Sequence, residues 1–367
     1  MSEELEAKHE RIAQFLAGQS LDALVLGRVA NFAWATGGRD GFIMVATEHA
    51  AAHLIYTADE KALVADRIEM PRFQGEEGLL PPEWTPIAPY WHADRAQMVH
   101  WNTVAQGKRT GADTDIPAAQ KLPGDIARLR YQLLPEEIKR YRALGRAAAH
   151  VLELTAHEIA PGMTEHAIAG AIAGKAIAQG LQAALTLVAT DERIFKYRHP
   201  IPTAKSLDKY AMLVLCARQH GLICSVTRFV HFGEVPNEIR TKSAACAQVD
   251  AAFILGSVPG RPARDVFAEA VNEYAKAGYA DEWRYHHQGG ACGYESRDYK
   301  ASPVSQEVIL ENQAFAWNPS IAGVKSEDTT LVTANGIDVL TAASADWPMI
   351  SVEWQGKTIE RPAILQR

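Results

Sequence analysis

The sequence predicts a mixed α/β (α+β) protein of two domains, a smaller one over residues 1–133 and a larger one over residues 134–367. Three observations lead to this prediction. The 367 residues exceed what one hydrophobic core usually organises. Apolar runs of strand length alternate with longer stretches of helical periodicity. In the larger domain one plan of Pro-Gly, helix, loop and strands occurs twice, from Pro161 and again from Pro259, which predicts an internal pseudo-twofold repeat.

The composition is that of an ordinary globular protein and argues against several classes of function. Hydrophobic residues make up 47% and charged residues 22%, and the net charge is −7. A negative net charge gives no electrostatic footprint for nucleic acid. The sequence has no run of about 18 apolar residues, so we expect no membrane span. Because residues 1–16 lack the apolar core of a signal peptide, we expect a cytoplasmic protein without nucleic-acid or membrane partners.

The four cysteines are not arranged in CxxC pairs. In a cytoplasmic chain this spacing indicates reduced, partly buried thiols. A zinc site formed by Cys216, Cys224, Cys292 and His286 is a less favoured alternative.

The smaller domain is expected to form a small mixed sheet. A helix over residues 4–16 precedes a strand at 21–26, and Gly37-Gly38 then breaks the chain. Further predicted elements are strands at 42–45 and 52–56, an irregular loop at 71–89, and a helix that resumes near Trp101.

The larger domain begins with Pro135-Glu-Glu, a typical helix start. Two Pro-Gly pairs separate its predicted helices, which cover residues 135–159, 164–179, 237–255 and 264–277. A hairpin with arms at 211–217 and 222–232 lies between the two helix pairs, and a last group of strands follows them.

Several short segments of the larger domain, in their order and spacing, resemble a known family. They are Leu134-Pro-Glu-Glu-Ile, Cys224-Ser-Val-Thr-Arg228, Gln288-Gly-Gly-Ala-Cys-Gly293, Trp317-Asn-Pro-Ser-Ile and Gly323-Val-Lys-Ser-Glu-Asp-Thr329. The chain is similar to the creatinase, prolidase, aminopeptidase P and methionine aminopeptidase family, weakly before about residue 134 and strongly after it. The resemblance implies an N-terminal creatinase/prolidase-like domain and a C-terminal catalytic domain with the pita-bread fold.

The resemblance also implies where metal ligands would be. Peptidases of this family hold two divalent metals with two Asp, one His and two Glu, since hard cations prefer carboxylate oxygens. The matching positions here hold Val214, Ser225, Gly290, Asn318 and Glu327. Val and Gly side chains cannot coordinate, and one carboxylate does not hold a dinuclear cluster. We therefore expect no metal and no other cofactor.

By resemblance to creatinase, His199 in Arg198-His-Pro is the candidate general base and then acid, since a histidine pKa lies near neutrality. Glu327 is its candidate partner or acid, because burial without metal would raise its pKa. Two plainer interpretations stay open, a loop histidine and a surface carboxylate.

Candidate substrate contacts come from the hairpin and from nearby loops. Ser225 and Thr227 share one face of the second hairpin arm, whereas Arg228 points to the other face and is expected to support the sheet. Asn318 faces opposite to Trp317. Cationic loop residues, which include Arg198, His287 and Arg297, indicate a substrate with an acidic group, unless they are only solvated loop charges.

Family members of this kind are typically homodimers in which the N-terminal domain of one subunit reaches the active site of the other. The resemblance assigns this contribution to the turn from Phe32 to Asp40, with Trp34 and Arg39 as lid or substrate contacts. The ordinary alternative for Trp34 is an indole packed beside a strand-end turn.

The leading hypothesis is a metal-independent hydrolase acting on a small, acidic C–N compound of amide, cyclic amidine or ureido type. Creatine itself does not fit, since Thr227 and Asn318 replace the carboxylates that hold its guanidinium in creatinase. The alternatives are a lyase using histidine-mediated elimination, a metal-dependent Xaa-Pro peptidase, and a catalytically silent ligand-binding homologue.

Overall fold

The computed structural model describes residues 2–92 and 107–367 and divides the chain into two compact units, 1–130 and 131–367. The division lies close to the expected boundary at residue 133. The helix expected near Trp101 lies outside the described residues. Among the described helices, none is both long and apolar enough to cross a membrane.

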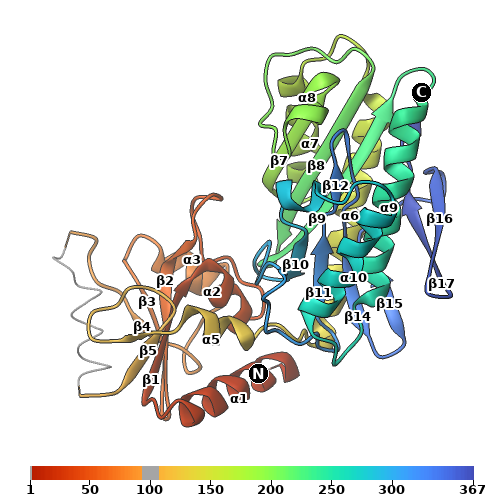
Figure 1. Cartoon of the computed structure of the whole chain (residues 1–367). Helices are drawn as coiled ribbons and strands as arrows, with labels where there is room; N and C mark the ends of the chain where they lie inside the picture. Colours follow the sequence, from red (N-terminus) through yellow and green to blue (C-terminus); the bar gives the residue numbers. More distant parts are fainter. Residues whose placement is uncertain (1, 93–106) are drawn as a thin grey trace. The chain divides into compact units, whose positions relative to one another are not determined.

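The first unit is built on a six-stranded sheet in the order β4-β3-β2-β1-β5-β6 (Figure 1). Its strands are β1 (Ala23–Arg28), β2 (His49–Thr57), β3 (Lys61–Ala65), β4 (Thr85–Ile87), β5 (Thr110–Ala112) and β6 (Gln120–Lys121). Its helices are α1 (Glu3–Gly18), α2 (Val29–Ala35), α3 (Met70–Gly75) and α5 (Pro123–Arg128). Aliphatic side chains of the central strands, among them Val25, Ile55 and Val64, form a buried core.

The prediction of a strand at residues 42–45 is wrong, because these residues lie in a loop. The backbone N–H of Ala51 donates to the carbonyl oxygen of Gly41 over 2.6 Å, which joins the two ends of this loop. Ile43 and Met44 are 65% and 67% exposed. A short apolar run does not by itself specify a strand, and these residues belong to none of the strands assigned in the described part of the chain.

The second unit contains two four-stranded sheets, β18-β9-β8-β7 and β10-β11-β14-β15. The elements of its first half are α6 (Pro135–Glu158), α7 (Glu165–Ala178), β7 (Gln182–Thr190), α8 (Glu192–Lys196), β8 (Tyr210–Gln219) and β9 (Leu222–His231). Those that follow are α9 (Asn237–Gly256), α10 (Ala263–Lys276), η1 (Glu282–Tyr285), β10 (Gly289–Cys292), β11 (Ala314–Trp317), β12 (Ser320–Ile321), β13 (Val324–Lys325), β14 (Asp328–Thr333), β15 (Gly336–Val339), β16 (Met349–Trp354), β17 (Lys357–Pro362) and β18 (Leu365–Gln366).

The two halves of this unit repeat one plan, as the paired Pro-Gly sequences predict. In each half a long helix ends shortly before Pro-Gly, a second helix follows, and strands complete the half (Figure 1). Gly162 and Gly260 both have positive φ angles, 92° and 86°, which favour glycine. Their N–H groups donate to equivalent acceptors, the carbonyl oxygens of Leu207 and Ile309, each over 2.8 Å. The mixed α/β class with an internal repeat is confirmed.

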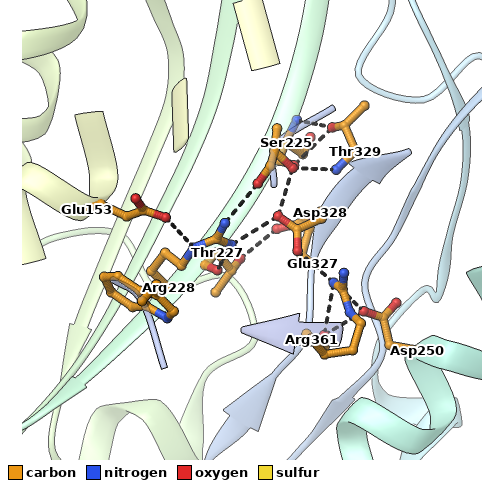
Figure 2. A network of polar contacts seen from close by, with 12 residues as sticks. Glu153, Ser225, Thr227, Arg228, Asp250, Glu327, Asp328, Thr329 and Arg361 are labelled. Carbon is orange, nitrogen blue, oxygen red and sulfur yellow. Dashed lines mark hydrogen bonds and ion pairs between the residues drawn. The ribbon is translucent and has the colours of Figure 1, made fainter. Parts of the chain in front are cut away.

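The two sheets meet where β9 lies beside β14. The N–H of Thr227 donates to the carbonyl oxygen of Glu327 over 3.1 Å. The N–H of Ser225 donates to Oγ1 of Thr329 over 2.8 Å, as Figure 2 shows. These bonds join the two halves and hold the segments that carry Thr227 and Glu327 side by side.

A pair of glycine substitutions tests the packing of α6. A Cβ on Gly145 would collide with the carbonyl oxygen of Leu340, so Gly145→Ala should destabilise the protein although alanine is the better helix former. A Cβ on Gly174 in α7 would have no other atom within 4 Å, so Gly174→Ala should stabilise by about 0.5–1 kcal/mol. Thermal unfolding of both variants measures the change in stability that each substitution causes. Equal shifts of Tm with the same sign would contradict the packing described.

Candidate active site

The β8–β9 hairpin presents one polar face to the seam between the sheets. Val214 pairs with Thr227 across the hairpin, and Cys216 pairs with Ser225. Directly paired residues project to the same side of a sheet, so these four side chains share a face. The shared face expected for Ser225 and Thr227 is therefore confirmed.

Arg228 points away from that face and belongs to a buried ionic network (Figure 2). Its Nη1 donates to Oδ1 of Asp328 over 3.0 Å. Nη2 of Arg361 lies 2.7 Å from carboxylate oxygens of both Asp328 and Asp250. Since Asp328 begins β14, this network fixes the backbone on which the adjacent Glu327 is carried. Arg228 has the structural role that the sequence predicted.

Glu327 is an almost fully buried carboxylate held by two cations. Nζ of Lys325 lies 2.6 Å from Oε2 of Glu327, and Nη2 of Arg297 lies 3.1 Å from Oε1. The hydroxyl of Thr227 donates to Oε2 over 2.7 Å. Only 4% of the residue is exposed, which rules out the surface carboxylate interpretation.

These contacts decide the charge of Glu327. Burial opposes ionisation, but the charges of Lys325 and Arg297 outweigh it and lower the pKa of Glu327 to about 2. The expectation of a raised pKa is wrong: burial does raise the pKa of Glu327, but the two cations buried with it, which the sequence did not reveal, lower it by more. Near neutral pH Glu327 is ionised and has no proton to give.

The other positions matched to metal ligands do not offer a coordination sphere. Val214 is buried and apolar. A Cβ at Gly290 would collide with the carbonyl oxygen of Tyr299, so the backbone closes the space in which a histidine would stand. The hydroxyl of Ser225 is within 3.3 Å of both Arg297 Nη1 and Cys216 Sγ. Two divalent ions do not fit this donor set, since the one remaining carboxylate is neutralised by two fixed cations.

Asn318 adds an unsatisfied polar atom to the same region. Asn318 and Glu327 follow directly beyond Trp317 and Asp328, the last pair of the β11–β14 ladder. Trp317 itself stacks on Phe253 with ring centroids 4.5 Å apart; that Asn318 faces the opposite way stays a prediction. Asn318 is buried, and its Oδ1 has no hydrogen-bond partner among the described residues. A buried acceptor of this kind is available to an N–H group of a ligand.

Three histidines lie together beside this carboxylate. Nε2 of His199 is 3.2 Å from Nε2 of His286, and the ring centroids of His286 and His287 are 4.8 Å apart. Burial and the charge of Lys325 lower the pKa of His199, while Glu327 opposes the shift. Burial and the charge of Arg297 lower the pKa of His287 to about 4. His287 is therefore neutral near pH 7 and acts there as a hydrogen-bonding group, not as the cation expected.

The histidine cluster is the one group of metal-ligand type found in the part of the chain that the structure describes. Imidazole nitrogens suit borderline metals such as Zn²⁺. However, the N–H of Gly289 donates to Nδ1 of His287, and Lys325 and Arg297 add positive charge. These features favour an anion over a cation beside the cluster. The four cysteines are buried and unbridged, and no zinc site involving them is found among the described residues.

Arg198 lies near the histidine cluster, since its charge acts on His286, but it forms an ion pair with Glu282. Trp34 and Arg39 lie in the first unit, where the Trp34 indole is fully buried and Arg39 is exposed. The burial of Trp34 matches the packed-indole alternative. The role of both residues in a neighbouring subunit stays a prediction.

Two important residues were missed or left without a role. Lys325 lies two positions before Glu327, and the alternation of side chains along an extended segment could have placed both on one face. His286 was named as a ligand in the less favoured zinc alternative, and nothing in its spacing indicated that it contacts His199.

Comparison with known proteins agrees with the pita-bread arrangement. The model of metallopeptidase family M24 matches residues 139–334, more than half of the chain. The chain belongs to this family. A Xaa-Pro dipeptidase of Lactobacillus helveticus is 26% identical over 238 residues, which cover 62% of this chain and 64% of that protein.

Solved structures share the fold over nearly the whole chain. A Xaa-Pro dipeptidase from Bacillus anthracis has a TM-score of 0.80 at 17% identity and covers 99% of this chain and 100% of its own. The prolidase from Pyrococcus horikoshii has a TM-score of 0.78 at 19% identity, over 92% and 99%. The expected family and fold are confirmed, and membership in M24 supports a hydrolase.

The buried charge cluster should make the stability of the protein depend on pH in the acid range. The pKa of Glu327 is lower in the folded protein than its ordinary value of 4.5, so its ionisation stabilises the fold above that pH. This stabilisation is lost as the pH falls from about 4.5 towards 2. Glu327→Gln should cost about 3–5 kcal/mol at pH 7, because Lys325 and Arg297 lose their partner.

Denaturant unfolding between about pH 2.5 and pH 7 measures both effects. The control is Glu238 on α9, which is exposed and ion-paired with Lys242. Glu238→Gln should leave the stability nearly unchanged, because solvent screens a charge pair at the surface. Equal effects of the two substitutions would contradict the assignment of a buried, ionised Glu327.

Proposed function

We propose that the chain is a hydrolase that cleaves a C–N bond of a small acidic compound without the dinuclear metal centre. One observation supports this proposal. At the place where the family holds metal ions, the side chains of Arg297 and Lys325 neutralise the one remaining carboxylate, Glu327. A charge balance that metal ions would otherwise provide is thus supplied by the chain itself. The remaining reactive group beside it is the imidazole of His199.

In this proposal His199 removes a proton from water and later donates it to the leaving nitrogen. Its lowered pKa keeps it neutral, and so able to act as a base, near pH 7. Glu327 has a corrected role, because it is permanently ionised: its negative charge favours the imidazolium form of His199 that arises during the reaction. It does not donate a proton.

The polar groups of the site that already have hydrogen-bond partners limit which contacts a substrate can make. The Thr227 hydroxyl donates to Glu327, so only its lone pairs remain for a ligand. Asn318 Oδ1 is free to accept the N–H of the C–N group. Arg297 and Lys325 together exceed the charge of Glu327 by one positive unit, which supports an acidic substrate; Ser225 and His287 complete the candidate hydrogen-bonding groups.

A metal-dependent Xaa-Pro peptidase is the second candidate, since the relatives with this printed name favour it. The two candidates differ in an assay of Xaa-Pro dipeptides and of N-acyl and N-carbamoyl amino acids, with and without added Mn²⁺. Cleavage of Xaa-Pro dipeptides only with Mn²⁺, together with two metals per chain by elemental analysis, would establish the peptidase. Hydrolysis after chelation would support the metal-independent reaction.

The remaining alternatives are separable by simple measurements. A lyase would release product without oxygen from ¹⁸O-labelled water, whereas a hydrolase incorporates it. A silent binding homologue would be stabilised thermally by a ligand without turnover. The cytoplasmic location and the homodimer, in which Trp34 and Arg39 serve the neighbouring site, are further parts of the proposal; sedimentation of the purified chain tests the dimer.

Removal of the proposed base gives the central prediction. His199→Ala should lower kcat by at least about 10²-fold, with little loss of stability because the residue is exposed. Steady-state turnover of whichever compound the wild type cleaves, with thermal unfolding in parallel, measures this.

The matched control is His150→Ala, which removes an exposed histidine from α6. It should leave both turnover and stability unchanged. Wild-type turnover in the His199→Ala variant would exclude the assignment of His199 as the base.

A further inference from the structure

His286 links the exposed base to the interior of the protein. Its Nε2 lies 3.2 Å from Nε2 of His199, and its Nδ1 lies 3.1 Å from Oγ of Ser320. Both ring nitrogens are therefore engaged, one towards the solvent-facing histidine and one towards a buried hydroxyl. The Nδ1 of His199 makes no hydrogen bond within residues 2–92 and 107–367, so it is the nitrogen that remains open for chemistry.

The position of His286 is fixed by a buried hydrogen-bond network. Nε2 of Gln288 donates to the carbonyl oxygen of His286 over 2.6 Å. The hydroxyl of Tyr274 donates to Oε1 of Gln288 over 2.8 Å and accepts the N–H of Ser320 over 2.8 Å. Ser320, Tyr274 and Gln288 are each nearly inaccessible to solvent. A ring supported in this way has little freedom to turn.

His286 carries one proton and not two. Burial and the charge of Lys325 lower its pKa far below the ordinary histidine value. A neutral imidazole donates through one nitrogen and accepts through the other. If Nδ1–H donates to Ser320, then Nε2 of His286 must accept, and the proton between the two rings belongs to Nε2 of His199.

We propose that His286 is a positioning residue that accepts the Nε2–H of His199 and thereby leaves Nδ1 of His199 as the base atom. This inference rests on the proposed function of His199. In the base step an O–H bond of water breaks and an Nδ1–H bond forms as the water oxygen forms a C–O bond to the substrate carbon; in the acid step the C–N bond and that Nδ1–H bond break, and an N–H bond forms on the leaving nitrogen. The Nε2–H of His199 stays in place throughout, held by His286.

Several charged groups influence the same pair and enter its pH dependence. The groups that act on His199 or His286 are Lys325, Glu327, Lys300, Arg297, Arg198 and His287. Glu327 favours protonation of His199 and the cations oppose it. A substitution that leaves these charges unchanged therefore isolates the effect of His286.

The test uses the full chain with ¹⁵N-labelled histidine. Ring ¹⁵N chemical shifts report which nitrogen is protonated, and their pH titration gives the pKa of His199. In the wild type, neutral His199 should be protonated on Nε2. His286→Leu, which removes the acceptor but retains bulk, should lower the pKa of His199 and populate its Nδ1–H form. His286→Gln, whose side-chain oxygen can accept near the same place, should restore the Nε2–H form.

A second variant keeps the inference testable if the His286→Leu variant does not fold. Ser320→Ala removes the acceptor of the His286 Nδ1–H, so His286 should shift its proton to Nε2 and His199 should shift its own to Nδ1. Wild-type His199 protonated on Nδ1, or an unchanged tautomer and pKa in both His286→Leu and Ser320→Ala, would overturn the inference.

Turnover measurements separate this inference from the proposed function. His286→Leu should lower kcat by about 10²-fold with little change in KM, and His286→Gln should recover most of the loss. If His199→Ala retains activity while the NMR results hold, the proposed function fails and the pairing of the rings stands. If His199→Ala is inactive but the NMR results are negative, only the role of His286 fails.

Discussion

The ion pairs of Glu327 with Arg297 and Lys325 are the interaction on which the site depends. A buried carboxylate without a counter-charge would take up a proton or destabilise the fold. Here the two cations keep it ionised, and Thr227 adds a hydrogen bond from β9. Because β9 and β14 belong to different sheets, the same cluster joins the two halves of the second unit and sets the charge beside His199.

The network behind the seam makes this arrangement rigid. Asp328 follows Glu327 directly and is held by Arg228 and Arg361. Consecutive residues of an extended segment project to opposite sides, so one carboxylate faces the site and the next anchors the strand. An M24 fold with Val214, Ser225, Gly290 and Asn318 at the positions matched to metal ligands therefore still has a well-defined cluster of polar groups at the corresponding place.

The histidine cluster extends this polar region towards the surface. His286 is buried and neutral, whereas His199 is exposed, and their contact joins an interior hydrogen-bond network to a solvent-facing base. Burial and the charge of Lys325 lower the pKa values of both rings. Membership in family M24 supports a hydrolase, whereas the two cations buried beside Glu327 disfavour a metal ion there.

The sequence by itself determined most of the local elements of the second unit. Pro-Gly pairs, helical periodicity and alternating hairpin residues specify local conformation, so the two helix pairs, the β8–β9 hairpin and the shared face of Ser225 and Thr227 were predicted correctly. The apolar run at residues 42–45 was misassigned because these residues lie in a loop, and a short apolar run does not by itself distinguish a strand from a loop. Only the tertiary structure decided the charge state of Glu327, the burial of Trp34 and the contact of His286 with His199. Each depends on groups distant in the chain, and a pKa or a tautomer is a property of the neighbours that folding supplies.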